Sequence, residues 1–171
     1  MKSFYLFVLL FAGFLLKAQE IEMYLLTPAD FKNQIAKSSR EFHLVYSFGY
    51  WCKPCRETMP QLMEVIAERT DIAFYPLMVE KLDSEAVPQN VDYLKAEFDY
   101  TGPVFSSDPA LNKKPWKAYN ALVEGLVTGH DQYGMSLILL FNKNGEVLLA
   151  TNYNMSSEEK VEKLNIALIK N

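Results

Sequence analysis

The sequence predicts an α/β fold in which a central mixed β-sheet carries helices on both faces. Two apolar runs, at 42–48 and 71–79, are rich in aromatic and β-branched residues. Runs of this kind are typical of parallel strands that are covered on both sides. Segments with helical spacing alternate with these runs, and a hairpin pattern at 137–152 adds antiparallel strands.

Length and composition indicate a single globular domain. The chain has 171 residues, half of them apolar, which is enough for a sizeable core. The net charge of −4 is spread along the chain, without a run of lysine or arginine. These features argue against nucleic acid or an acidic membrane surface as a partner. We expect residues 19–171 to form the domain.

The first residues have the pattern of a secretory signal peptide, which we place at 1–18. Lys2 precedes an apolar block from Phe4 to Leu16, and the small residue Ala18 follows just before Gln19. The block is shorter than the roughly 20 residues that a membrane span needs. A buried first helix or an uncleaved anchor is the alternative. The pattern predicts a periplasmic or secreted protein, in a compartment where disulfides persist.

The first half of the domain is predicted to begin with a strand and a helix. The strand covers 22–26. Thr27 can cap the helix and Pro28 can take its first position, because the first turn makes no use of that N–H. After the first buried strand, a further helix is expected from Cys52 to about Arg69.

The second half of the domain has a looser pattern. Its acidic, proline-containing stretch 80–90 is predicted to be a loop. Asn144 and Gly145 can adopt the positive φ angles of a tight hairpin turn. Ser156 or Ser157 can cap a final amphipathic helix. Helices are also expected at 89–98 and 112–122, and an extended segment at 102–107.

The only two cysteines lie in the segment WCKPC at 51–55. Cys52 follows a buried strand and opens a helix, where unpaired N–H groups and the helix dipole favour the nucleophilic thiolate. Lys53 adds a positive charge, and Pro54 is tolerated in the first turn. Cys55 lies one turn further on the same face and can resolve a mixed disulfide. The spacing therefore predicts thiol–disulfide exchange.

Three other interpretations of the cysteine pair stay open at this point. A zinc site needs four ligands, and only His43 and His130 could complete it, with His43 in the middle of a strand. A purely structural disulfide would gain little, because it closes a very short loop. A redox-inactive descendant of a redox fold is the third alternative.

Two other groups of residues are candidates for a functional role. Trp116, Tyr119 and Leu122 recur at helical spacing and are expected in the core rather than in a cofactor site. His130 and Asp131 could act as an acid or a base, but a solvated loop is the expected location.

Two segments resemble the thioredoxin superfamily. VYSFGYWCKPCRETMP is similar to the thioredoxin active-site segment, and Pro60 matches the kink proline of its helix. YGMSLILLFNKNGEVL is similar to the segment that carries the cis-proline loop and the following hairpin. With the leader and an extra segment before that loop, the chain most resembles extracytoplasmic TlpA/ResA-like thiol–disulfide oxidoreductases. The resemblance implies a thioredoxin-like fold over roughly residues 27–170.

The chain departs from the family pattern at three positions. Ser136 stands where the family has its cis-proline, and Tyr46 stands where cytoplasmic thioredoxins have a buried Asp. Many TlpA-like proteins have a Glu where this chain has Thr58, with Glu57 one position earlier. A cis bond before a non-proline residue costs roughly 2.5–4 kcal/mol, so the bond between Met135 and Ser136 is predicted to be trans. Proton transfer from the second cysteine would then rely on water or Glu57.

The resemblance and the residues together predict an oxidoreductase that acts on extracytoplasmic protein thiols and disulfides. Cys52 would attack, Cys55 would resolve, and a dithiol protein would be the redox partner, with no bound cofactor and no metal. The alternative is a peptide-binding module of the same fold with idle cysteines.

Restoring the proline at 136 is expected to speed exchange and to lower any uptake of a soft metal by the two thiolates. The predicted substrate-side residues are Tyr50, Trp51, Pro54, Met135 and Ser136.

Overall fold

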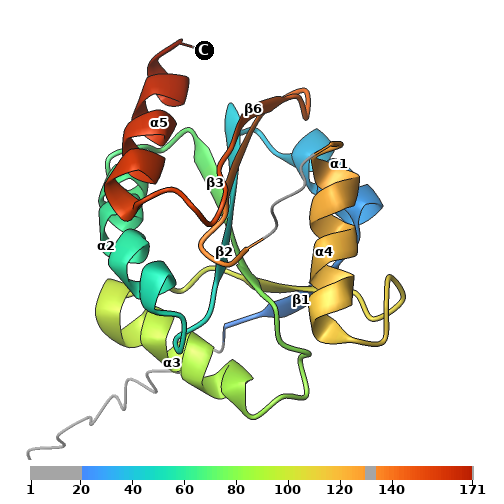
Figure 1. The fold of residues 1–171 in the computed structure, drawn as a ribbon. Helices are drawn as coiled ribbons and strands as arrows, with labels where there is room; N and C mark the ends of the chain where they lie inside the picture. Colours follow the sequence, from blue (N-terminus) through green and yellow to red (C-terminus); the bar gives the residue numbers. More distant parts are fainter. Residues whose placement is uncertain (1–20, 130–133, 171) are drawn as a thin grey trace, which may run out of the picture.

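The computed structural model describes residues 21–129 and 134–170; the predicted signal peptide and His130–Asp131 lie outside them. Within this part of the chain, six strands form one sheet that is flanked by five helices (Figure 1). None of the described helices has the length and apolar character needed to span a bilayer. The strands are β1 (Met23–Leu26), β2 (Phe42–Phe48), β3 (Ile72–Met78), β4 (Val104–Ser107), β5 (Ile138–Asn142) and β6 (Val147–Ala150). The helices are α1 (Pro28–Lys37), α2 (Lys53–Ala67), α3 (Ala86–Phe98), α4 (Pro115–Leu126) and α5 (Ser157–Lys170).

The sheet is mixed, as predicted, with strand order β1-β4-β3-β2-β5-β6. The pairs β1–β4, β4–β3 and β3–β2 are parallel, whereas β2–β5 and β5–β6 are antiparallel. Strand β4 lies between β1 and β3, so β1 pairs with β4 alone among the described strands. Strand β2 is central, and Tyr46 near its end pairs with Pro76 on one side and Ile138 on the other.

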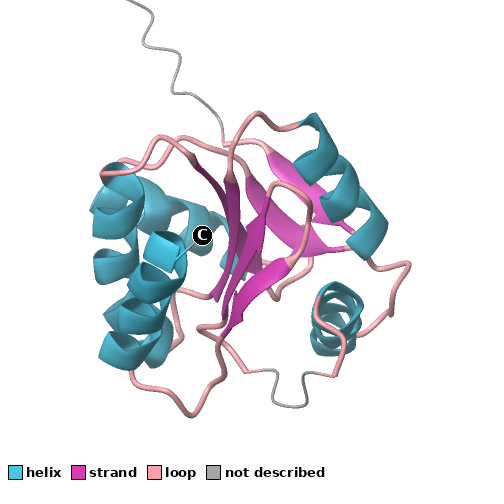
Figure 2. Ribbon diagram, turned by 90° about the horizontal axis from the view of Figure 1, so that it is seen from above, coloured by secondary structure: helices cyan, strands magenta, loops and turns pink. Residues whose placement is uncertain are grey.

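Helices cover both faces of the sheet, which confirms the predicted layering (Figure 2). Helices α1 and α4 bury their apolar residues against one face, and α2, α3 and α5 bury theirs against the other. All seven residues of β2 are buried, because this strand is covered on both sides. Its side chains alternate: Leu44, Tyr46 and Phe48 face α2, while Val45 faces α1 and α4.

The predicted helix and turn signals act locally as expected. The Thr27 hydroxyl accepts the Asp30 N–H at 3.1 Å, and the Asp30 carboxylate accepts the Thr27 N–H at 3.1 Å, which completes a capping box before α1. Ser156, not Ser157, caps α5, because its hydroxyl accepts the Glu159 N–H at 3.1 Å. In the β5–β6 turn, only Gly145 of the predicted pair has a positive φ, of 80°.

The middle of the chain differs from the prediction in two places. Helix α3 begins at Ala86, inside the stretch predicted to be a loop, because Pro88 falls in the first turn, where its missing N–H costs nothing. Helix α4 begins later than expected, with Pro115 at its first position. Tyr119 and Leu122 are buried as predicted, but Trp116 is 42% exposed, so the predicted core position for Trp116 is wrong. Trp116 lies in the first turn of α4, where it lines a surface groove.

Candidate active site

The cysteine pair follows the C-terminal end of the central strand β2. After Phe48 the chain turns through Gly49, Tyr50 and Trp51, and the Cys52 N–H donates to the Gly49 carbonyl at 2.9 Å. This turn ends the strand and places Cys52 at the N-cap position of α2. A short link between a buried strand and a helix thus holds the first cysteine in one orientation.

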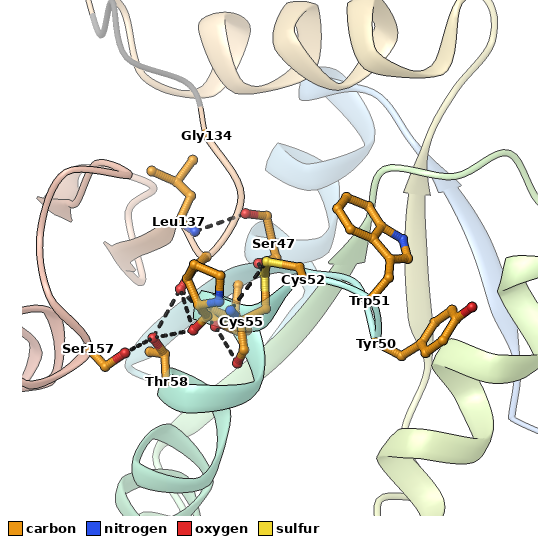
Figure 3. Close-up of a disulfide and its surroundings, with 12 residues drawn as sticks. Ser47, Tyr50, Trp51, Cys52, Cys55, Thr58, Gly134, Leu137 and Ser157 are labelled. Carbon is orange, nitrogen blue, oxygen red and sulfur yellow. Dashed lines mark hydrogen bonds between the residues drawn. A yellow bond between two sulfur atoms is a disulfide. The ribbon is translucent and has the colours of Figure 1, made fainter.

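Cys52 and Cys55 form a disulfide across the first turn of α2 (Figure 3). Cys52 is the outer residue, with 5% of its surface exposed, and Cys55 is the inner one, with 1%. The Cys55 N–H points at the Cys52 sulfur from 3.3 Å. Once the disulfide is reduced, this N–H and the helix N-terminus stabilise negative charge on Cys52. The Cys55 sulfur lies 3.8 Å from the Ser47 carbonyl, which can accept a hydrogen bond from its thiol.

Four hydroxyl groups form a hydrogen-bonded chain next to Cys55, which we call the hydroxyl cluster; it consists of Tyr46, Ser136, Thr58 and Ser157. The Ser136 hydroxyl lies 3.0 Å from both the Tyr46 and the Thr58 hydroxyl. Thr58 donates to Ser157 at 2.8 Å, and Tyr46 donates to the Cys55 carbonyl at 3.0 Å. Burial raises the pKa of the Tyr46 phenol well above its ordinary value, so it stays protonated at physiological pH.

The three departures from the thioredoxin pattern therefore meet at one point. Tyr46, Thr58 and Ser136 come from β2, α2 and the segment before β5, and all three are completely buried. Each hydroxyl has at least one of the others as a partner, which satisfies polar atoms that would otherwise be costly to bury. These positions form one connected hydrogen-bonded unit rather than three separate losses.

Ser136 confirms one prediction and corrects another. No cis peptide bond occurs in the described residues, so the Met135–Ser136 bond is trans, as predicted. Ser136 has a φ of 62°, its N–H donates to the Ser47 carbonyl at 3.0 Å, and its side chain is fully buried. Its hydroxyl bonds within the hydroxyl cluster, to Tyr46 and Thr58. The predicted contact of this side chain with a substrate is therefore not available in this structure.

The predicted supporting residues lie on the outer surface of α2. Glu57 is exposed and forms an ion pair with Lys53 at 3.7 Å. Thr58, not Glu57, lies beside Cys55, where a proton acceptor was expected. Glu57 is one residue earlier and therefore projects from α2 about 100° away from Thr58. Pro54 and Pro60 are also exposed, and Pro60 lies inside α2 as the family resemblance implied.

The remaining predicted substrate-side residues flank Cys52. Trp51 is 52% exposed, and Tyr50 and Met135 are half-buried. Figure 3 shows Trp51 on one side of Cys52 and the segment from Gly134 to Leu137 on the other. The structure thus brings Trp51 and the loop that carries Met135 to opposite sides of the outer sulfur.

Two residues that the sequence analysis missed hold this turn in place. The Tyr50 N–H donates to the amide oxygen of buried Asn90 at 2.7 Å, and the Asn90 amide nitrogen donates to Glu80 at 3.2 Å. The other oxygen of Glu80 accepts the Trp51 indole N–H. Glu80 and Asn90 lie 29 and 40 residues from their partners, in a stretch predicted to be a loop, so no local pattern could indicate them.

The described residues contain no group of three or more His, Cys, Asp or Glu side chains that could hold a metal ion. His43 is completely buried in β2, and its Nδ1 lies 3.1 Å from the Tyr75 hydroxyl. Burial lowers the pKa of His43, which favours the neutral imidazole in the folded protein. His43 is therefore part of the core on the side of α1 and α4.

The family model for thioredoxin matches residues 22–96, from β1 into α3, and this segment includes both cysteines. The chain has the thioredoxin fold. This agrees with the superfamily that the sequence resembles, and the matched segment carries the redox-capable cysteine pair at 52 and 55.

Solved structures share the fold of this thioredoxin-like protein. A thioredoxin-like protein from Aeropyrum pernix has a TM-score of 0.54 at 10% identity, covering 80% of this chain and 81% of its own. A thiol:disulfide interchange protein of the thioredoxin family from Chlorobium tepidum has a TM-score of 0.51 at 19% identity, covering 80% and 84%. At these identities the likeness concerns the fold alone. The comparison with curated protein sequences finds no match.

Proposed function

We propose that this thioredoxin-like protein is an extracytoplasmic thiol–disulfide oxidoreductase that exchanges disulfides with protein substrates. The observation that supports the proposal most is the Cys52–Cys55 disulfide at the N-terminus of α2, with an outer and an inner sulfur. A reactive thiol needs a site that stabilises its thiolate, and a resolving thiol needs protection from competing reactants. Cys52 lies at the helix N-terminus and is the more exposed of the two, which suits the attacking thiol, and Cys55 is the more buried, which suits the resolving thiol.

Reduction of a substrate would proceed in two steps that conserve electrons. The Cys52 thiolate attacks a substrate disulfide, forms a mixed disulfide, and releases the first substrate sulfur as a thiolate that takes a proton from water. Cys55 then loses its proton and attacks the Cys52 sulfur, which releases the second substrate thiol and closes the Cys52–Cys55 disulfide. Two electrons pass to the substrate, and a partner dithiol protein returns them. The reverse sequence would oxidise a substrate dithiol.

The place of action is inferred from the N-terminal sequence. Lys2, the apolar block up to Leu16 and Ala18 match a signal peptide, and an oxidising compartment suits a protein whose cysteine pair cycles through a disulfide. Protein substrates are favoured over small thiols because exposed residues, Trp51 and Pro54 among them, surround the outer cysteine. An extended substrate segment would lie between Trp51 and Met135.

The two cysteines themselves offer a matched pair of variants for the test. Cys55→Ser should accumulate mixed disulfides with protein substrates, because the resolving step is removed, whereas Cys52→Ser should accumulate none. In the reduced wild type, iodoacetamide should label Cys52 first at pH 6, as identified by peptide mass spectrometry. The reduction potential of the pair, measured against glutathione, then gives the direction of transfer.

The opposite results would identify the alternative function. If both thiols reacted equally with iodoacetamide and the wild type reduced neither insulin nor a peptide disulfide, the cysteines would be idle. The protein would then be a peptide-binding module of the thioredoxin fold.

A further inference from the structure

A surface groove is lined by Trp51, the residue before the outer cysteine, and by Trp116. It has a volume of about 500 Å³, and both tryptophans of the chain line it. Trp51 comes from the turn before Cys52 and is 52% exposed, while Trp116 comes from the first turn of α4 and is 42% exposed. Val79 and Pro115 add apolar surface between them. We refer to this feature as the aromatic groove.

One wall of the aromatic groove is held rigidly. The Trp51 indole N–H donates to Glu80, whose second oxygen accepts from Asn90, and Asn90 in turn accepts the Tyr50 N–H. The indole ring also packs on Gly49 so closely that a Cβ there would lie 2.9 Å from the ring. A side chain that is fixed before binding loses little conformational entropy on contact with a ligand. The Trp51 ring is therefore preorganised.

The other wall is connected to the loop on the far side of Cys52. Trp116 packs against Tyr119, with 5.3 Å between ring centroids. The Tyr119 hydroxyl donates to the Gly134 carbonyl at 2.8 Å, next to Met135. Helix α4 thus supports both the aromatic groove and the loop that would face a substrate strand.

The charged residues that line the aromatic groove are Glu80, Lys81 and Asp83. Glu80 uses both of its oxygens in hydrogen bonds to Trp51 and Asn90, which leaves them less available to a ligand. Lys81 and Asp83 carry opposite charges along the same rim. With the Glu80 oxygens already engaged, the largest contact surface that the aromatic groove offers is the two indoles, which suit an apolar ring.

We propose that the aromatic groove accepts an aromatic or large aliphatic side chain that lies next to the reacting cysteine of a protein substrate. The inference rests on the proposed function. Any disulfide that reaches the Cys52 sulfur, with only 5% of that residue exposed, brings its flanking residues over Trp51. Burying a large apolar side chain between Trp51 and Trp116 supplies the binding energy. The groove thereby selects disulfides by the residue beside them.

The test uses peptides with one cysteine, oxidised to disulfide-linked dimers, with Phe, Leu, Ala or Arg on either side of the cysteine. The reduced protein should react with the Phe peptide about tenfold faster than with the Ala peptide, measured as second-order rate constants. Trp116→Ala should bring this ratio close to one, and Trp116→Phe should keep most of it. Ile169→Ala, which alters an 82% exposed residue on α5, is the matched control and should leave the ratio unchanged.

Each other outcome has a distinct meaning. Equal rates for the Phe and Ala peptides in the wild type, or a preserved preference in Trp116→Ala, would overturn the inference. A faster reaction with the Arg peptide would also overturn it, in favour of a cation–π site. If no peptide and no small aromatic disulfide reacted at all, the proposed function would fail first. The wild-type ratio is informative even where a variant does not fold.

Discussion

Replacing Ser136 with proline should unfold the site rather than improve it. Proline holds φ near −65°, whereas Ser136 has a φ of 62°, and the Ser136 N–H that proline lacks donates to the Ser47 carbonyl at 3.0 Å. The variant loses that hydrogen bond and also the two hydrogen bonds that the Ser136 hydroxyl forms with Tyr46 and Thr58. Its backbone must also leave the φ that Ser136 has in the wild type. The structure therefore argues against the sequence-based expectation that proline would speed disulfide exchange.

The magnitude follows from these separate losses. A typical intramolecular hydrogen bond contributes about 0.5–1.5 kcal/mol, and a proline that conflicts with its backbone inside a helix, for comparison, costs about 3 kcal/mol or more, lost hydrogen bond included. We expect Ser136→Pro to lower the free energy of unfolding by at least about 4 kcal/mol. A domain of this size has about 5–15 kcal/mol in total, so the loss is large. Urea unfolding followed by tryptophan fluorescence measures it.

Two matched variants separate the hydroxyl from the backbone at Ser136. Ser136→Ala removes the hydroxyl but keeps the strained φ, and should cost about 1–2 kcal/mol, because Tyr46 and Thr58 keep other partners at Cys55 and Pro54. Ser136→Gly removes the same hydroxyl and relieves the φ, so it should be about 1 kcal/mol more stable than the alanine variant. A proline variant within 1 kcal/mol of wild type, or a glycine variant below alanine, would refute this account.

Three further predictions concern other parts of the chain. Thr27→Ala should lower the free energy of unfolding in urea by about 1 kcal/mol, because it removes the capping box of α1; an unchanged midpoint would contradict this. Because the pKa of His43 is lowered in the folded protein, the unfolded chain binds more protons at this residue when the pH falls just below the ordinary pKa of 6.5. Wild-type stability should therefore be full above pH 6.5 and fall toward pH 5, more steeply than in His43→Gln; parallel profiles would exclude this cause. Mass spectrometry of the secreted protein should give an N-terminus at Gln19 or Glu20, whereas retained Met1 in a membrane fraction would indicate an anchor.

The sheet and most helices could be predicted because their signals are local. An apolar run such as 42–48 needs no knowledge of distant residues, nor does the cap at Thr27. The start of α3 was missed because its acidic residues and Pro88 have the composition of a loop. Burial of its apolar face against the sheet, with Val87 and Leu94 inside, outweighs that composition.

The site was predictable residue by residue but not as an arrangement. Tyr46, Thr58 and Ser136 were each recognised as departures, yet Ser136 lies 90 residues from Tyr46 and 78 from Thr58. No pattern along the chain indicates that three such hydroxyls share hydrogen bonds. The hydrogen bond between Trp51 and Glu80 could not be predicted for the same reason, because the two residues are 29 positions apart and no local pattern connects them.

The position of β4 between β1 and β3 has a consequence for how the chain acquires its structure. Met23 of β1 pairs with Val104 of β4, so the first strand to be synthesised finds its only described partner after most of the chain has followed. Closing so long a loop is entropically costly, and contacts of this kind form late. The β2–α2–β3 unit can assemble from neighbouring residues and would carry the cysteines while β1 is still unpaired. Oxidation of Cys52 and Cys55 can therefore precede completion of the sheet, while β1 still lacks its partner strand.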